Sequence, residues 1–277
     1  ILAIRQNLVG KVQEYERTSI FQKYKEKVGE IVICEVYQAW KREVLLLDEE
    51  GVEVILPKSE QIPGDFFRKG DTVKAIVLKV EMKNGIPSII LSRVSPIFLE
   101  RLFEQEVPEI YDGLIIIKDA VRQPGERAKI AVESYDDRID PVGSCVGVKG
   151  SRIHSIIREL RNENIDVINY TNNAELYIAR ALAPAKVISV SIDEENKKAD
   201  VYMQPDQVSL AIGKGGYNIR LAGKLTGYEI EVYRDTDMDY EDVALIEFRD
   251  EIEDWIIEEL QSIGCDTAKS VLELSVQ

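Results

Sequence analysis

The stretch Gly147-Val148-Lys149-Gly150 lies between a short apolar segment and a segment with the apolar spacing of a helix. The same kind of loop recurs as Gly213-Lys214-Gly215-Gly216. The flanks match as well, because a spacing of 66 residues separates three pairs: Asp140 and Asp206, Gly147 and Gly213, and Ile153 and Ile219. A loop, its flanks and its spacing are therefore repeated together.

Such a loop favours contact with phosphate. Glycines at both ends let the backbone turn without a Cβ clash and leave room for a ligand to approach the main chain. Each loop precedes a predicted helix, so free N–H groups and the positive end of the helix dipole face whatever approaches. One such loop could be an ordinary helix C-cap, whereas two copies with shared flanks favour a functional role.

Composition indicates a globular protein with more than one domain. The chain has 277 residues, of which 45% are hydrophobic. It has no apolar run near the roughly 20 residues that cross a bilayer and no secretory signal pattern, so we predict a cytoplasmic location and no membrane partner. Cys34, Cys145 and Cys265 are far apart, which favours reduced thiols over a disulfide framework or a zinc site.

The acidity of the chain lies mainly at its end. The net charge is −15, but residues 237–277 alone carry −11 and the remainder −4. The overall charge therefore does not exclude a nucleic-acid partner. Apolar residues at three- and four-residue steps predict that 237–277 is an acidic helical tail, whose plain role is solubility or docking. One hypothesis is that the tail competes with a nucleic acid for the loop surface. Its ending, 263–272, looks like part of a helix-hairpin-helix module.

The apolar pattern in the first third of the chain predicts a helix followed by a barrel. Residues 1–27 have helical periodicity, and we interpret them as a connector at the end of a missing N-terminal domain. Residues 28–94 change to a period of two, and five short strands in this length favour a small closed barrel of the OB type. The predicted strands are 31–36, 44–47, 52–56, 73–80 and 86–91.

Two units of the same element order follow. Residues 95–170 predict α-β-β-α-loop-α-β, beginning with the capping pair Ser95-Pro96. Residues 171–236 repeat this order, with Asp206 predicted to cap the helix before the second loop. No flexible linker separates the units, so we expect a rigid pair with one continuous surface. The fold class is multidomain α+β, with helical segments at both ends.

The repeated unit resembles the bacterial kind of KH domain. In such domains the GxxG loop clamps the sugar-phosphate backbone of about four nucleotides of a single strand. Val148, Ile153 and Ile219 could line the adjoining groove, but the helix positions Ile153 and Ile219 more often face a core. The resemblance implies that RNA is contacted by the loops and the first helical turns after them. These residues are Gly147, Val148, Lys149, Gly150, Ser151, Arg152, Gly213, Lys214, Gly215, Gly216, Asn218 and Arg220.

The barrel resembles the S-one class of RNA-binding OB domain. The resemblance rests on stretches such as Leu56-Pro57-Lys58-Ser59-Glu60 and Ile90-Leu91-Ser92-Arg93. Where that class usually has an aromatic pair, this chain has Lys41-Arg42-Glu43. Bases could then stack only on Trp40, Phe66 and Phe67. Each of these could equally belong to the core, so contact between barrel and RNA stays open.

A barrel of this class followed by two fused KH domains resembles the NusA family of bacterial transcription factors. The resemblance covers 29–233 and includes the stretches 102–110, 140–147 and 209–213. It implies binding of nascent single-stranded RNA during pausing, termination and antitermination. It also implies RNA polymerase as a partner, mainly through an N-terminal domain missing from this sequence, together with other transcription factors. We expect a monomer without a cofactor.

An enzyme is the main rival interpretation. The chain has one histidine, His154, which is a poor basis for acid-base catalysis. The sequence has no Walker A loop, HExxH motif or Gly-x-Ser-x-Gly elbow, so we predict no catalytic residue and no metal ligand. The alternatives kept open are an RNA-binding accessory part of an RNA-processing enzyme, and a ribosome-associated or protein-binding factor.

Overall fold

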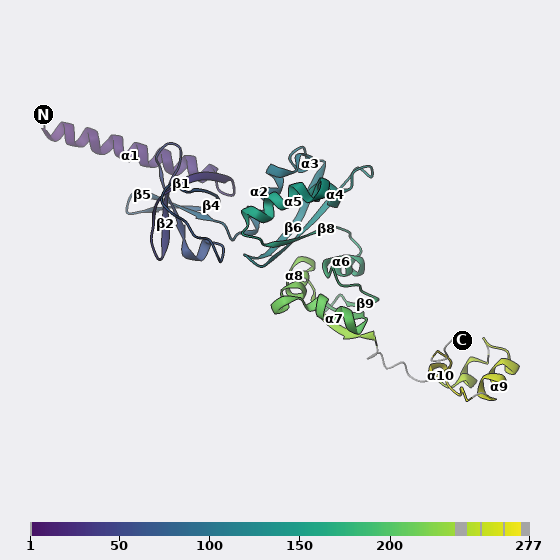
Figure 1. The fold of residues 1–277 in the computed structure, drawn as a ribbon. Helices are drawn as coiled ribbons and strands as arrows, with labels where there is room; N and C mark the ends of the chain where they lie inside the picture. The colour runs from purple at the N-terminus through teal and green to yellow at the C-terminus, as the bar shows by residue number, and fades with distance from the viewer. Residues whose placement is uncertain (1, 236–242, 250, 263, 273–277) are drawn as a thin grey trace.

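The fold is that of a computed structural model describing residues 2–235, 243–249, 251–262 and 264–272. Along these residues a long helix leads into a β-barrel, two α+β units follow, and short helices lie near the C-terminus (Figure 1). The predicted acidic tail falls partly outside the described residues, which exclude 236–242, 250, 263 and 273–277.

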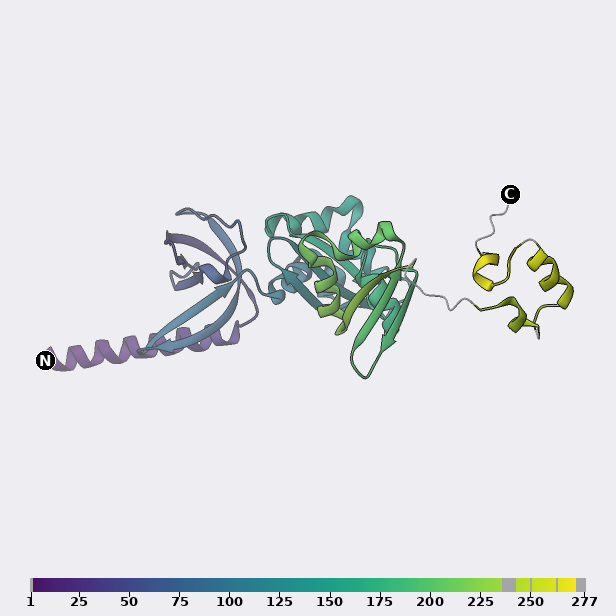
Figure 2. The ribbon, with the colours of Figure 1, turned by 90° about the horizontal axis from the view of Figure 1, so that it is seen from below.

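Helix α1 (Leu2–Glu26) is attached to the barrel by its C-terminal end. Tyr24 is 1% exposed within the barrel core, and its hydroxyl donates a hydrogen bond to Asp48. Residues 6–19 are exposed. Figure 2 shows α1 running alongside the long barrel strands and out beyond them. The predicted helix is present over nearly its full length.

The five predicted strands form a closed barrel in the order β1-β2-β3-β5-β4. Buried residues occupy every second position of a strand, as Val44 and Leu46 do on β2. Of the candidate stacking residues, Trp40 and Phe66 are exposed, whereas Phe67 packs on the barrel core. Assignment of the barrel to the S-one class stays a prediction. The strands are β1 (Ile31–Ala39), β2 (Glu43–Leu47), β3 (Glu53–Pro57), β4 (Thr72–Lys83) and β5 (Ile86–Ser92).

The first α+β unit has the predicted element order. Strand β7 pairs antiparallel with β6 and parallel with β8. Ser95 caps α2 as predicted by accepting from Ile97 N, and Pro108 begins a further short helix, α3. The elements are α2 (Pro96–Glu106), α3 (Pro108–Tyr111), β6 (Ile115–Gln123), β7 (Arg127–Ser134), α4 (Pro141–Val146), α5 (Ser151–Glu159) and β8 (Asn164–Asn169).

The second unit repeats this topology, with β10 antiparallel to β9 and parallel to β11. The predicted cap Asp206 is wrong. Asp140 caps α4 by accepting from Val142 N, whereas the N-cap of α7 is Gln204 and Asp206 lies within its first turn. Helix α7 has eight residues and α4 has six, so the 66-residue spacing fails at the helix start. The elements are α6 (Ala174–Ala181), β9 (Ser189–Asp193), β10 (Lys198–Met203), α7 (Pro205–Ile212), α8 (Tyr217–Thr226) and β11 (Glu229–Arg234).

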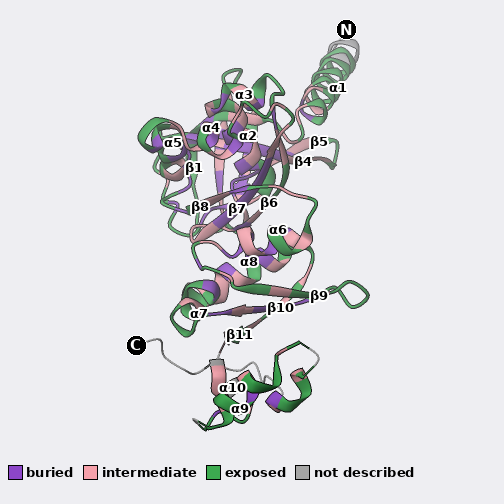
Figure 3. Ribbon diagram, turned by 90° about the vertical axis from the view of Figure 1, so that its right-hand side faces the viewer, coloured by how far each residue is buried: buried purple, intermediate pink, exposed green. Residues whose placement is uncertain are grey.

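The two units share a hydrophobic core. Ala131 and Ile168 of the first unit are buried in one cluster with Ile178 and Ala222 of the second. Figure 3 shows burial concentrated in the sheets and the helices packed on them, while α1 is exposed. The sheet of the first unit is thus covered in part by the helices of the second.

Buried ion pairs join the barrel to the first unit. Asp65, whose side chain is fully buried, accepts from Arg93 Nε and Arg161 Nε at 2.9 Å each. Arg93 also contacts Glu159 of α5 at 2.8 Å. Because an unpaired buried charge is costly, these contacts hold the barrel loop against the end of α5.

The described C-terminal residues form three short helices rather than one long amphipathic helix. They are η5 (Leu245–Phe248), α9 (Asp254–Ser262) and α10 (Ala268–Leu272). Leu245, Ile257 and Cys265 are buried. The helix-hairpin-helix resemblance begins at Ile263, outside the described residues, and stays a prediction. Across the described residues, every helix is too short or too polar to cross a membrane.

Candidate nucleic-acid interface

The two glycine loops follow the same backbone path. Gly147 has φ 75° and ψ 171°, and Gly213 has φ 71° and ψ 175°. The last glycines, Gly150 and Gly216, are both left-handed, with φ 76° and 70°. The duplication seen in the sequence is therefore a duplication of shape.

The loop lysines do not occupy equivalent positions. Lys149 is the third residue of its loop and has a left-handed φ of 51°, where the second loop has Gly215 at φ 60°. Lys214 is the second residue of its loop, where the first loop has Val148, which is 82% exposed. The two loops thus present their cations at different points of one backbone shape.

Arg152 fixes the first loop. A Cβ at Gly147 would lie 2.8 Å from Arg152 Cγ, so only glycine fits there. Arg152 Nη1 donates to Ser144 O at 2.6 Å and pairs with Glu109 at 2.8 Å. The guanidinium expected to contact RNA is therefore engaged in joining the preceding helix to α3.

Asn218, which is 66 residues after Arg152, has the same role in the second loop. A Cβ at Gly213 would lie 2.7 Å from Asn218 Cβ. The Asn218 amide donates to three carbonyl oxygens, those of Leu182, Leu210 and Ala211, at 3.1 to 3.2 Å. Asn218 is 0% exposed, so in this structure its side chain supports the loop, and its contact with RNA stays a prediction. Sequence alone could not separate a residue that supports the loop from one that binds.

Both loops lead into helices that have no capping side chain among the described residues. Gly150 and Gly216 are the N-caps of α5 and α8. The first N–H of each helix donates to a loop carbonyl, from Ser151 to Val148 O and from Tyr217 to Lys214 O. The next N–H groups and the positive end of the helix dipole still attract anions. Ser151, the first residue of α5, is exposed. Phosphate binding at the two loops stays a prediction.

One neighbour of each loop lies on the first turn of the following helix. A Cβ at Gly150 would lie 2.7 Å from His154 Cε1, so the imidazole covers the last glycine. The equivalent residue in the second loop is Arg220, which donates to Gly215 O at 3.4 Å. His154 was not among the predicted contacts, although the 66-residue spacing pairs it with Arg220.

Helix α5 separates the two loops. The first loop precedes Ser151, at its N-terminal end. Beyond its C-terminal end, a cavity of about 450 Å³ lies between the second loop and the first unit. It is lined by Gly125, Glu126, Arg127, Arg161, Asn162, Asn164, Lys214, Tyr217 and Asn218. Because α5 has nine residues, it spans about 14 Å.

The aliphatic residues considered for the groove differ in exposure. Ile153 is 9% exposed and belongs to the core of the first unit. Ile219 is half-buried and packs on the core shared by the two units. Val148 alone among these three is largely exposed, so it is the aliphatic side chain most available to a base.

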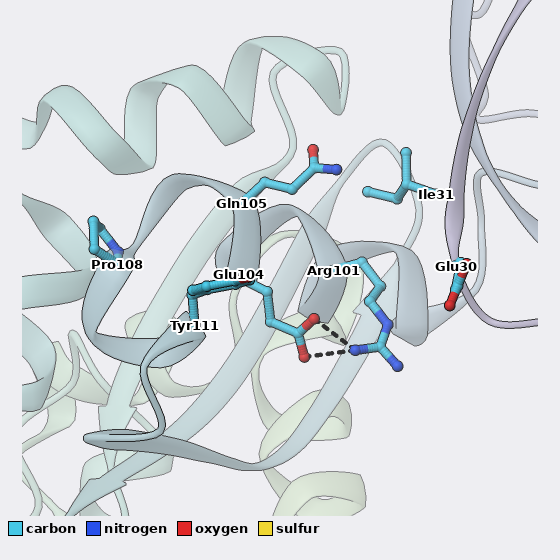
Figure 4. A pocket seen from close by; sticks show the side chains of 7 residues that line it. All are labelled: Glu30, Ile31, Arg101, Glu104, Gln105, Pro108 and Tyr111. Carbon is cyan, nitrogen blue, oxygen red and sulfur yellow. Dashed lines mark hydrogen bonds and ion pairs between the residues drawn. The ribbon is translucent and has the colours of Figure 1, made fainter.

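A larger cavity of about 630 Å³ lies away from both loops (Figure 4). Arg101 spans it, with Nε donating to Gly29 O at 3.0 Å and Nη1 donating to both carboxylate oxygens of Glu104. No residue of the two glycine loops lines this cavity, so we do not count it as part of the candidate RNA interface. Across the described residues, no group of three or more His, Cys, Asp and Glu side chains could hold a metal ion.

Comparisons with known proteins agree with this geometry. Residues 93–170 match the model of a NusA-like first KH domain, and residues 174–239 match that of a NusA-like second KH domain. Together these matches include both loops, the helices that flank them and the three-stranded sheets.

Similar curated proteins have the name transcription termination/antitermination protein NusA. That of Halalkalibacterium halodurans is 42% identical over 228 residues, covering 82% of this chain and 59% of the relative. That of Thermus thermophilus is 42% identical over 227 residues, covering 82% and 59%. That of Bacillus subtilis is 40% identical over 233 residues, covering 84% and 62%. The chain thus spans about three fifths of these relatives. With both KH matches in order and this identity across the barrel and loops, the chain belongs to the NusA family.

Proposed function

We propose that this chain is the RNA-binding part of a transcription elongation factor. It holds nascent single-stranded RNA and modulates pausing, termination and antitermination by RNA polymerase. The relatives' shared name supports this role, and the two loops support RNA as the ligand. Bacterial transcription takes place in the cytoplasm, where we place the protein as a monomer. RNA polymerase and other transcription factors are its proposed partners.

The observation that carries the proposal is the pair of identical loop backbones, each leading into a helix without a side-chain cap. A KH loop of this kind clamps about four nucleotides. The first loop lies at the N-terminal end of α5 and the second lies beyond its C-terminal end, so a strand of roughly ten nucleotides, with about four on each loop, could engage both. Phosphate contacts would position this strand, while base contacts would select its sequence.

Catalysis is no part of the proposed role. An RNA-binding accessory of a processing enzyme remains the second candidate, because its KH surface would look the same. A magnesium-dependent nuclease assay on the purified chain separates the two interpretations. Turnover above background would favour the enzyme.

The direct test is binding of a labelled single-stranded RNA of about ten nucleotides, with a duplex of the same sequence as control. We expect Lys149→Asp and Lys214→Asp each to weaken binding, because each puts an anion beside a phosphate. Lys11→Asp is the matched control, since Lys11 is exposed on α1 and outside both units. Full affinity in the double variant would refute the loop clamp.

RNA length provides a second test. Strands of four or five nucleotides should engage one loop, so that only one lysine variant lowers their affinity. Strands of about ten nucleotides should respond to both, because the second contact becomes intramolecular. Equal sensitivity of short and long strands to both variants would contradict a two-loop track.

A further inference from the structure

The lysine of the second loop is held by a carboxylate from the first KH domain. Lys214 Nζ lies 2.8 Å from Glu126 Oε2, and their side chains are 83% and 38% exposed. The hydrogen bond and attraction to Glu126 raise the pKa of Lys214. Lys149 in the first loop is exposed, and the position equivalent to Lys214 there is Val148. The second loop alone thus has a cation neutralised across the domain boundary.

The position of this carboxylate is where an RNA phosphate is expected. Lys214 lies in the loop that leads into α8, whose first N–H groups have no side-chain cap. A phosphate bound at that helix terminus would find Lys214 the nearest loop cation. A phosphate in contact with Lys214 would lie close to the Glu126 carboxylate, and the two negative charges would repel each other. Close contact of Lys214 with RNA therefore requires Glu126 to move.

Only the side chain of Glu126 is free to move. Its neighbour Gly125 donates to buried Glu163 at 2.9 Å, and a Cβ at Gly125 would lie 3.2 Å from Pro63 O of the barrel. The carbonyl of Glu126 itself accepts from Asn164 N at 3.1 Å. The hairpin tip is therefore fixed between barrel and sheet. RNA would displace a carboxylate, not a loop.

We propose that Glu126 is an internal competitor of RNA at the second KH loop. Its carboxylate holds Lys214 in the free chain, and a phosphate of the bound strand replaces it. The inference rests on the proposed function, because it names a residue that sets the affinity of that same site. The first loop needs no such exchange, so it binds a strand first, and the second loop closes on strands long enough to reach it.

The test compares Glu126→Gln with Glu133→Gln in RNA binding at several salt concentrations. Glu133 lies on the same hairpin and pairs with Lys118 at 3.3 Å, so both variants remove one negative charge and one ion pair. We expect E126Q to bind the ten-nucleotide RNA about two- to fivefold more tightly than E133Q, the range of an exposed ion pair. Its salt dependence should steepen by up to about 0.7 in log-log slope, because the wild-type carboxylate takes up a cation when RNA displaces it, which offsets the ion released by one phosphate contact.

A third variant isolates the lysine. In a Lys214→Gln background, E126Q should give no gain over Lys214→Gln alone. E126Q binding no more tightly than E133Q, or gaining equally without Lys214, would overturn the inference while leaving the proposed function intact. Weaker binding by E126Q would make Glu126 a structural residue and also overturn it. A wild-type chain that binds no RNA would overturn the proposed function and this inference together.

Discussion

Replacing Gly213 by alanine should destabilise the second KH domain far more than the same change two residues later. At Gly213 the backbone has φ 71° and ψ 175°, a region open almost only to glycine, where other residues cost about 1–3 kcal/mol. The added Cβ would also lie 2.7 Å from Asn218 Cβ, close to the main chain, where nothing flexible can yield. We expect a loss of about 3 kcal/mol in the free energy of unfolding.

Gly215→Ala is the matched control within the loop. Gly215 has φ 60° and ψ 15°, and the equivalent residue of the first loop, Lys149, already carries a side chain there. Left-handed strain of about 1–2 kcal/mol is partly offset, because alanine lowers the entropy of the unfolded chain by about 0.4–1 kcal/mol. The predicted net loss is about 1 kcal/mol or less.

Urea unfolding followed by far-UV circular dichroism measures both variants. Tryptophan fluorescence would miss the effect, because Trp40 and Trp255 both lie outside the second KH domain. Hydrogen exchange of the α8 amides supplies a local readout. If the two variants unfold within about 0.5 kcal/mol of each other, steric conflict with Asn218 does not explain why Gly213 is glycine.

Three further predictions concern buried polar groups. Asp65→Ala leaves the 2%-exposed Arg93 with Glu159 as its remaining carboxylate partner, so we expect a loss of about 3 kcal/mol in urea unfolding. Near-wild-type stability would contradict a buried ionic junction. Asn218→Ala removes the amide that donates to three carbonyl oxygens, so it should lower the free energy of unfolding by about 1–3 kcal/mol. It should also lower RNA affinity, and unchanged affinity would show that the loop keeps its shape without the amide. Burial raises the pKa of Cys145 from 9.0 to about 12, so between these pH values the unfolded chain loses a thiol proton that the folded chain keeps. Stability should therefore hold below pH 9 and fall as pH rises above it; a urea midpoint that falls between pH 8 and pH 10.5 equally in wild type and Cys145→Ala would assign the fall to other groups.

Periodicity predicted the architecture because it reports which side of each element is buried. Val52, Val54 and Leu56 recur at every second residue, which marks a strand with one face in the barrel without knowledge of the rest of the fold, and Val54 and Leu56 are buried there. Ser95 likewise carries its capping role in the local sequence. The cap at Asp206 was wrong, because the equal spacing of the loops did not extend to the helix before the second one.

The roles of individual site residues depended on contacts that sequence does not encode locally. Asn218 was an expected RNA contact, yet one of its three bonds reaches Leu182, at the end of another helix. Glu126 was not considered, because its partner Lys214 is 88 residues away. A polar residue after a glycine loop looks the same in sequence whether it faces solvent or supports the loop. Tertiary packing decides between these roles.

The core shared by the two KH domains determines whether the protein or the RNA loses more conformational entropy on binding. Ala131 and Ile168 are buried together with Ala222 of α8, so a hinge between the loops would expose apolar surface to water. The protein therefore offers a preformed template, and the loss of conformational entropy falls mainly on the strand. Strands that are already extended and weakly stacked lose least. A preference for such compositions would then arise even where no side chain touches the edge of a base.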